Sequence, residues 1–380
     1  MTAVVFTGLG AVSAYGTVDG RGVPRLVHGL AEGRPPAFAP AEDPATRPID
    51  PTLLDEEEPR RWLPAAINEA LRGARWPEDG APPVLLLAGQ APAPAASDNP
   101  LYAPTAVEVG PHRWEHPLVI SHACASALFA VHFAERLIRS GAHDAVLVAG
   151  VSVCTPCASE SLRVVKAIGT VPSRPFDRER DGILIGEGAG AALLERASTA
   201  LARGAVPLAE LGASVAEIGG ASSAASDTAI VFDAMTRAIR DAGAPGVDYV
   251  HAHATGTVQG DAAEIEAVSR LAAERGLSEL PVSSHKGALG HLLHASGFPG
   301  LIVAVSAVRD GVLPTTIGLR RPLVADGVDL LVEGPAIRPR RRVDHVLVNA
   351  FGFGGNNACV LVRRSPSVRP HRPSGFTPPG

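Results

Sequence analysis

The sequence predicts an α/β fold in which helices cover both faces of buried strands. One observation is a strand–helix–strand succession. Residues 118–139 combine an apolar strand, a turn at Cys124 and a helix, and residues 145–153 form the next buried strand. A second observation is that a similar succession restarts at residue 207. The related order of elements indicates an internal duplication, although no clear residue-level repeat is visible.

The first half opens with an apolar run at residues 4–13 that ends in glycine turns, a pattern typical of a buried strand. Residues 31–57, rich in proline, alanine and acidic residues, are interpreted as an irregular surface segment. Residues 60–72 predict a helix because their apolar side chains recur at helical spacing. These side chains are Trp62, Leu63, Ala66, Ile67, Ala70 and Leu71. A strand is expected at residues 84–88, followed by a loose stretch at 91–104.

The second half shows the same kind of alternation. Its expected elements are a strand at 207–219, a helix at Asp227–Asp241, a strand at 247–253, a helix at Ala262–Ala273, a strand at 281–284, a helix from His291 to Arg309, and a closing pair of strands at 343–350 and 358–364. The tail at 365–380 contains five prolines and is expected to be disordered.

Composition excludes several classes of protein. Hydrophobic residues form 46% of the 380 residues and charged residues 19%, which is typical of a globular protein. The net charge of −5 argues against binding nucleic acid over a broad surface. Four cysteines are too few for a disulfide-stapled secreted domain of this size. The longest apolar runs are shorter than the ~18 residues of a membrane span, and the N-terminus has no basic leader. We therefore expect a cytoplasmic protein.

Cys124 is the strongest candidate for a reactive residue. It lies at a strand-to-helix turn, where unpaired N–H groups and the helix dipole would favour a thiolate. Its neighbours are small, so a substrate could approach. An ordinary buried core cysteine would fit this context equally well.

Two histidines are candidates for the same site. His253 follows a strand end, and His291 is expected to open a helix after a glycine. Such positions gather site residues in an α/β sheet. Because the chain contains 13 histidines, several must be bystanders, and His251 and His294 are interpreted as such.

Three further patterns carry weaker signals. Lys166 and Lys286 are the only lysines, which hints at a need for a compact ammonium, although chance would explain it as well. The glycine-rich segment 351–357 could bring N–H groups to an oxyanion, whereas 186–190 indicates close backbone packing. Cys154 and Cys157 have the spacing of metal ligands, but no second pair completes a site, so they are interpreted as core thiols in apolar strand-like runs, as is Cys359.

Five ordered segments resemble the β-ketoacyl-acyl carrier protein synthases that use a Cys-His-His site. They are SHACASA around Cys124, RPFDRERDGILIGEGAGAALLE at 174–195, HAHATGTVQGDAAEIEA at 251–267, VSSHKGALGHLLHASG at 282–297 and NAFGFGGNNA at 349–358. The resemblance implies a thiolase-like duplicated fold with layers α-β-α-β-α. Its halves would be residues 1–206, with the cysteine, and 207–364, with both histidines.

The resemblance also implies roles for individual residues. Cys124 would accept the acyl chain, and His253 and His291 would hold the malonyl thioester carbonyl while carbon dioxide leaves. N–H groups of Cys124 and Phe353 would form the oxyanion hole, and Phe353 would gate access. Lys286 would orient the site through its charge. Arg163 and Lys166 are candidates for contacts with the carrier protein.

The sequence departs from the family pattern at several positions. Ala254 replaces a usual glycine, Asn356 a usual threonine, and Gly300 a buried glutamate that commonly follows the second histidine. The segments before Cys124 and at 212–228 are short, and residues 55–58 are acidic where the family often offers basic residues to its carrier.

The implied function is decarboxylative condensation of carrier-bound malonyl with an acyl group on Cys124, in a specialised fatty acid or polyketide pathway. No cofactor or metal is implied. The expected partners are an acyl carrier protein with phosphopantetheine thioesters and a second subunit, either a copy of this chain or a ketosynthase-like paralogue. Two alternatives stay open. One is an acyltransferase or cyclase that uses the acyl-cysteine without elongation. The other is a non-catalytic partner subunit, against which the two histidines and the cysteine argue.

Overall fold

The fold is described by a computed structural model. The described residues are 2–16, 22–54, 58–89, 104–170, 172–220, 226–337 and 342–366. The acidic residues 55–57, the loose stretch predicted at 91–104 (except Pro104) and the predicted tail from residue 367 onward lie outside the described residues.

An eleven-stranded sheet repeats one pairing pattern in each half of the chain. In the first half the order is β1 (Val4–Val12), β9 (Gly188–Arg196), β7 (Ala145–Ser152), β3 (Val84–Ala88) and β6 (Leu118–Ile120). In the second half it is β10 (Ala209–Ile218), β15 (Asn356–Arg363), β14 (His345–Gly352), β11 (Tyr249–His251) and β12 (Leu280–Ser283). Both sets pair antiparallel, antiparallel, parallel and parallel in that order, and β13 (Val328–Leu330) adds one more parallel strand to the second. The duplication predicted from the order of elements is therefore present in the topology.

The two halves are joined at a seam between β1 and β10. Val4, Val5 and Phe6 of β1 pair antiparallel with Leu211, Glu210 and Ala209 of β10, while the rest of β1 continues its ladder with β9. Strand β1 thus belongs to the hydrogen-bond ladders of both halves.

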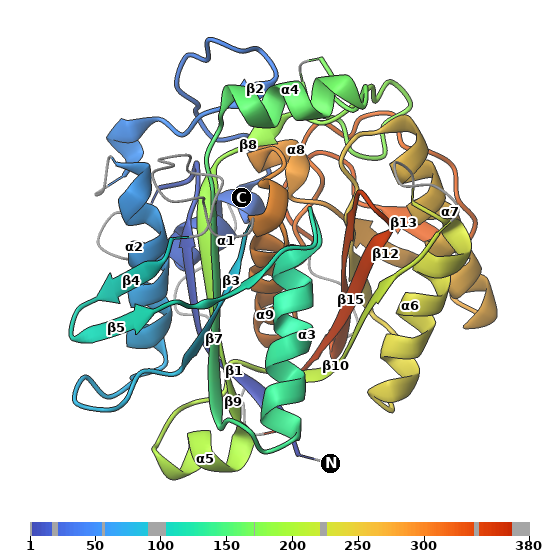
Figure 1. The fold of residues 1–380 in the computed structure, drawn as a ribbon. Coiled ribbons are helices and arrows are strands. Elements are labelled where there is room, and N and C mark those ends of the chain that lie inside the picture. Colours follow the sequence, from blue (N-terminus) through green and yellow to red (C-terminus); the bar gives the residue numbers. More distant parts are fainter. Residues whose placement is uncertain are drawn as a thin grey trace, which may run out of the picture.

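Helices form a central layer and two outer layers, as the thiolase-like prediction requires. The central helices α3 (Ser126–Arg139) and α9 (Gly297–Asp310) each contact strands of both halves (Figure 1). Helix α2 (Pro59–Gly73) covers the first half from outside, and α6 (Thr228–Asp241) and α7 (Val258–Glu274) cover the second. Helix α1 (Gly22–Glu32) contacts β1 and the central helix α9. All twelve residues from Gly297 to Val308 of α9 are buried, because a central helix has sheet on two sides.

Shorter elements surround these layers. They are β2 (Thr46–Arg47), η2 (Pro51–Leu53), β4 (Ala106–Val109), β5 (His112–Glu115), α4 (Pro156–Val164), β8 (Ile185–Gly186), α5 (Ala197–Ala202), α8 (Lys286–Leu289) and η3 (Leu293–Ala295). The β4–β5 hairpin and helices α1, α4 and α5 have no counterpart in the sequence prediction. In the described residues no helix combines the length and apolar character that crossing a membrane requires.

The helix predicted from His291 to Arg309 is wrong in its first part. Helix α9 begins at Gly297, and His291 lies in a bend where its N–H donates to the oxygen of Leu184 at 2.7 Å. Gly290 has a positive φ of 74°, and His291 forms a β-bridge with Ile185. Backbone pairing with the β8 segment therefore outweighs the helical pattern, and it fixes the position of His291.

Candidate active site

Cys124 lies in a tight turn between β6 and α3. Ala123 has a positive φ of 47°, and helix α3 begins two residues after the cysteine. The Ser126 hydroxyl accepts a hydrogen bond from the N–H of His122 at 2.8 Å and donates one to the oxygen of Ala123 at 2.7 Å. A Cβ at Gly352 would lie 3.0 Å from the Cys124 nitrogen, so glycine is needed where β14 meets this turn. Hydrogen bonds to Ser126 and close contact with Gly352 of β14 thus hold the turn in place.

The Cys124 thiol is buried and protonated at neutral pH. Only 8% of the residue is exposed, and burial raises its pKa to about 11, although the charge of Lys286 acts in the opposite direction. The thiolate expected from the helix start is therefore not the resting form of this thiol, because desolvation outweighs the helix dipole. Its proton must leave during the reaction.

His253 and His291 lie together on the same cavity as Cys124. Their ring centroids are 5.5 Å apart in a T-shaped arrangement. Burial and the Lys286 charge hold the pKa of both imidazoles well below its usual range, so both rings are neutral. His253 Nδ1 and both ring nitrogens of His291 are buried and have no hydrogen-bond partner among the described residues. These three nitrogens are therefore enclosed and unpaired among the described residues, while both rings belong to the lining of the cavity that contains Cys124.

Two carboxylates of α7 fix the loop that carries His253. Glu264 accepts N–H bonds from His253 at 2.9 Å and from Ala254 at 2.7 Å, and an amide bond from Asn349 at 3.0 Å. The usual glycine is therefore not required at residue 254 for this contact.

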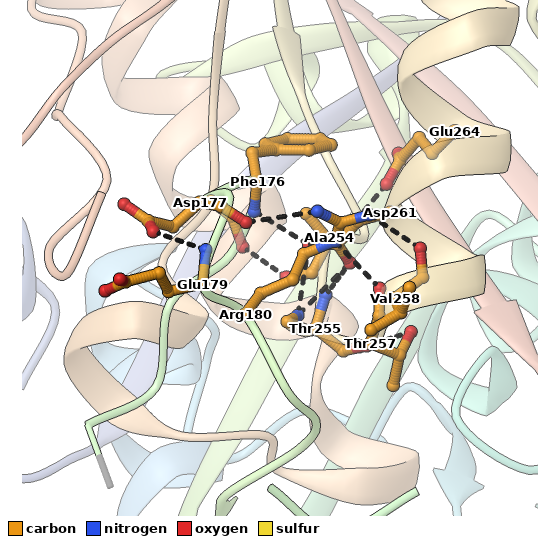
Figure 2. A network of polar contacts seen from close by, with 12 residues as sticks. Phe176, Asp177, Glu179, Arg180, Ala254, Thr255, Thr257, Val258, Asp261 and Glu264 are labelled. Carbon is orange, nitrogen blue, oxygen red and sulfur yellow. Dashed lines mark hydrogen bonds and ion pairs between the residues drawn. The ribbon is translucent and has the colours of Figure 1, made fainter. Parts of the chain in front are cut away.

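Asp261 holds the next part of that loop (Figure 2). It accepts N–H bonds from Thr255 at 2.9 Å and from Phe176 at 2.7 Å, and it lies 3.9 Å from the Arg180 guanidinium. Arg180 in turn donates to the oxygen of Val258 at 2.7 Å. The segment 174–195, which contains Phe176 and Arg180, therefore contributes support for the histidine loop.

Lys286 lies behind the histidines and is 2% exposed. Its ammonium donates a hydrogen bond to the oxygen of His253. Burial lowers its pKa to about 8, while the charges of Glu264, Cys124 and Asp261 favour the ammonium. The orienting role that the family resemblance implies for Lys286 stays a prediction.

A cavity of about 390 Å³ contains the candidate site residues. Its lining includes Cys124, His253, His291 and Phe353, with Thr255 and Thr257 further along. The oxygen of Phe353 accepts a bond from the Asn356 amide at 2.6 Å, and the other end of that amide is 2.9 Å from His122 Nδ1. Asn356, a departure from the family pattern, thus connects the Phe353 loop to the turn that precedes Cys124.

The two carrier-binding candidates lie in different settings. Lys166 is exposed and lines the cavity that contains Cys124. Arg163 is outside that lining and is engaged in ion pairs with Asp43 and Glu160. Of the two, Lys166 is the better placed to meet an incoming anionic group.

The other cysteines differ from the sequence interpretation at one position. Cys157 is exposed on α4, so its assignment to a buried apolar strand is wrong. Its apolar neighbours belong to an amphipathic helix that Thr155 caps and Pro156 begins. Cys154 is half-buried, and Cys359 is fully buried in β15. Within the described residues no three His, Cys, Asp or Glu side chains are grouped as metal ligands.

Sequence reasoning missed a set of buried polar residues beside this site. His251, interpreted as a bystander, is hydrogen-bonded to Tyr249 and His285 behind the cavity. The period of two along β11 could have indicated that Tyr249 and His251 share a face. His294 Nε2 lies 2.5 Å from the oxygen of Val151, and the bystander interpretation suits this residue.

Comparison with known proteins gives consistent matches. The family model for the N-terminal domain of β-ketoacyl synthase matches residues 117–200, and that for the C-terminal domain matches residues 208–320. The 3-oxoacyl-[acyl-carrier-protein] synthase 2 of Vibrio cholerae is 36% identical over 262 residues, which cover 65% of this chain and 62% of that protein. The tetracenomycin polyketide synthase ketoacyl synthase alpha subunit of Streptomyces glaucescens is 34% identical, over 66% of this chain and 61% of that protein.

A solved structure matches over more of the chain. The ishigamide ketosynthase/chain length factor has a TM-score of 0.80 and 25% identity, and the match covers 96% of this chain and 99% of that one. By sequence, the chain spans about three fifths of the length of the curated relatives that it matches.

Proposed function

We propose that this chain, which belongs to the β-ketoacyl synthase family, condenses an acyl group held on Cys124 with a malonyl unit on a carrier protein. The observation that carries the proposal is that Cys124, His253 and His291 line one cavity. A nucleophilic thiol and two neutral imidazoles with free nitrogens are the groups that this chemistry requires. The nucleophile would come from the half at residues 1–206 and both histidines from the half at 207–364.

The first step is transfer of the acyl group. The Cys124 sulfur attacks the carbonyl of an acyl thioester, the carbon–sulfur bond to the carrier breaks, and the thiol proton goes to the departing thiolate. N–H groups of Cys124 and Phe353 would stabilise the oxyanion of the intermediate. Lys286 favours the thiolate of Cys124 by its charge.

The second step is decarboxylation and carbon–carbon bond formation. Imidazole N–H groups of His253 and His291 would donate to the malonyl thioester oxygen. The bond to the carboxylate then breaks, carbon dioxide leaves, and the electron pair forms an enolate. The enolate carbon attacks the acyl carbonyl, the bond to Cys124 breaks, and the thiolate regains one proton from solvent. Both rings are neutral, so each imidazole has one N–H group that can donate a hydrogen bond.

The proposed partner is an acyl carrier protein that delivers phosphopantetheine thioesters. The name of the Vibrio cholerae relative supports a carrier of this kind, and the exposed Lys166 on the cavity lining offers a positive charge to it. We further propose that the chain works in the cytoplasm, in a specialised fatty acid or polyketide pathway, as a homodimer or with a ketosynthase-like paralogue.

The proposal is tested with isotope-labelled malonyl carrier thioester and a panel of acyl carrier thioesters. Released carbon dioxide and a ketoacyl product would support condensation. An acyl adduct on Cys124 without carbon dioxide would instead favour an acyltransferase or cyclase. Absence of any adduct with the whole panel would favour the non-catalytic partner subunit.

Acyl transfer is expected to modify Cys124 alone, although Cys157 is the more exposed thiol. Only Cys124 lies beside the two histidines, whereas simple alkylation depends on the exposure and the thiolate content of a cysteine. Peptide mapping after incubation with an acyl carrier thioester measures the modified residue. Iodoacetamide provides the comparison, because it should label Cys157 readily. Acylation of Cys157 in place of Cys124 would contradict the assignment of the nucleophile.

Reversing the charge at Lys166 is expected to weaken use of the carrier. Lys166→Glu should raise KM for the carrier thioester by about 10-fold, with a smaller effect on kcat, because a rim charge acts mainly on association. The matched control is Arg163→Glu, whose parent side chain already pairs with acidic neighbours. Steady-state kinetics at low salt measures both. If Arg163→Glu raised KM more than Lys166→Glu did, Arg163 and not Lys166 would be the main contact for the carrier.

A further inference from the structure

A buried hydrogen-bond chain lies behind the reacting residues. Tyr249 Oη is 2.8 Å from His251 Nδ1 and 2.5 Å from Ser283 Oγ. His251 Nε2 is 2.8 Å from His285 Nδ1, and the two rings differ in orientation by only 2°. All four side chains are at most 2% exposed.

These hydrogen bonds connect the two segments that carry Lys286 and His253. His251 ends β11, two residues before His253, and His285 directly precedes Lys286 at the start of α8. The Lys286 ammonium bridges the same two segments through its bond to the His253 oxygen. The His251–His285 pair and Lys286 therefore connect the same two segments, the end of β11 and the start of α8, at neighbouring points.

The two linked imidazoles are neutral, so they do not repel Lys286. Burial lowers the pKa of His251 to about 3 and that of His285 well below its usual range, and the Lys286 charge acts in the same direction. Each ring then has one N–H, so the donors of the two hydrogen bonds from Tyr249 through His251 to His285 all point in the same direction. If the Tyr249 hydroxyl donates to His251 Nδ1, then His251 Nε2 must donate to His285 Nδ1.

Gly300 makes room for this arrangement. A Cβ at residue 300 would lie 3.1 Å from His251 Cδ2 and 2.9 Å from Val348 Cγ1. A larger side chain on α9 would therefore displace the His251 ring. The glycine at 300, a departure that the proposed reaction leaves unexplained, is accounted for by the histidine pair.

Packing alone does not account for these residues. Burying polar side chains opposes folding unless their hydrogen bonds are made, and His285 Nε2 has no partner among the described residues. Apolar side chains would fill the same space without that cost. The hydrogen-bonded row of Tyr249, His251 and His285 is better explained by its effect on how β11 and α8 are held together.

We propose that His251 and His285, supported by Tyr249, are positioning residues that hold Lys286 against His253 and beside Cys124. The kinetic part of this inference rests on the proposed condensing function. Loss of the central His251–His285 bond would let α8 shift relative to β11 and move the ammonium away from the thiol.

Two substitutions at one position separate positioning from packing. In His285→Asn the amide can place a polar atom near the former Nδ1 and keep a bond to His251, whereas His285→Leu fills the space without one. The leucine variant should lower kcat by about 10-fold or more with KM for malonyl carrier nearly unchanged, because small misplacement in a catalytic site has large effects. The asparagine variant should recover most of that loss. Thermal unfolding should show the leucine variant to be at least as stable as the asparagine variant.

A second readout does not depend on turnover. Burial raises the pKa of the Cys124 thiol, and the charge of Lys286 opposes that rise. A displaced ammonium should therefore slow alkylation of Cys124 at pH 7 by several-fold in the leucine variant, as followed by peptide mapping. Tyr249→Phe keeps the buried ring volume and provides a milder variant if leucine impairs folding. His132→Leu is the control, because His132 lies on α3 and its hydrogen bond goes to Ser214 of β10, outside the junction between β11 and α8.

The outcomes are distinguishable. If wild-type protein releases no carbon dioxide with any malonyl carrier, the condensing function fails, and the alkylation rates alone decide the inference. If the leucine, asparagine and phenylalanine variants match wild type both in alkylation of Cys124 and in any turnover, the positioning role is overturned. Activity that follows thermal stability across the variants would also overturn it.

Discussion

Replacing Cys124 with glutamine should abolish condensation completely and leave release of carbon dioxide from malonyl carrier thioester intact. Acyl transfer cannot begin without the sulfur. Decarboxylation needs only that the malonyl carbonyl be held by His253 and His291, both of which line the cavity. A glutamine amide is close in size to an acylated cysteine and offers a carbonyl to the N–H groups of the turn.

The experiment follows labelled carbon dioxide and ketoacyl product in parallel. Adding His291→Ala to the glutamine variant should reduce the release by roughly 10²-fold or more, the scale for losing a positioned hydrogen-bonding catalyst. Cys157→Ser serves as the control because that thiol is exposed outside the cavity, and it should behave as wild type. If both wild type and the glutamine variant released no carbon dioxide, the acyltransfer or cyclase alternative would replace condensation.

Replacing Lys286 with arginine should reduce turnover by about 10²-fold although the positive charge is retained. Lys286 is 2% exposed, and its compact ammonium reaches the His253 oxygen inside a packed turn. The adjacent Gly287 is so close to the Ile317 backbone that a Cβ would lie 1.8 Å from its oxygen. The planar guanidinium is larger and directs its donors differently, so it would displace this turn. Turnover of the arginine variant equal to wild type would leave Lys286 without an orienting role.

The same residue predicts a basic limit to activity. Because burial lowers the pKa of Lys286 to about 8, the ammonium is present below that pH and is lost as pH rises through it. Activity that depends on the ammonium should therefore fall above about pH 8 in the wild type. An arginine stays charged far above this range, so any residual activity of Lys286→Arg should lack that limit. A pH–rate profile of kcat for both proteins measures the difference.

Strong local periodicity accounts for what the sequence predicted well. The six apolar positions expected to form the buried face of the helix at residues 60–72 are the six buried residues of α2, and the strand expected at 84–88 has the same bounds as β3. Cys124 and His253 could also be placed, because a residue that follows a strand end lies at the edge of the sheet where sites form.

The parts that sequence reasoning missed depend on contacts between distant segments. His291 follows a helical pattern, yet its backbone pairs with Leu184 and Ile185, about a hundred residues earlier. The burial of Cys124, which raises its pKa, comes from segments that no local pattern reveals. The link between His251 and His285 joins residues 34 apart, so each looked like an isolated histidine.

The seam between β1 and β10 decides how this molecule can move. Cys124 comes from one half and both histidines from the other, and the halves share one hydrogen-bonded sheet through Val4–Phe6. Helices α3 and α9 also contact strands on both sides of the seam. Rotating one half against the other would break ladder bonds and central packing together. We therefore expect substrate exchange to depend on rearrangement of the cavity lining, such as that of Phe353, and not on closure of one half over the other.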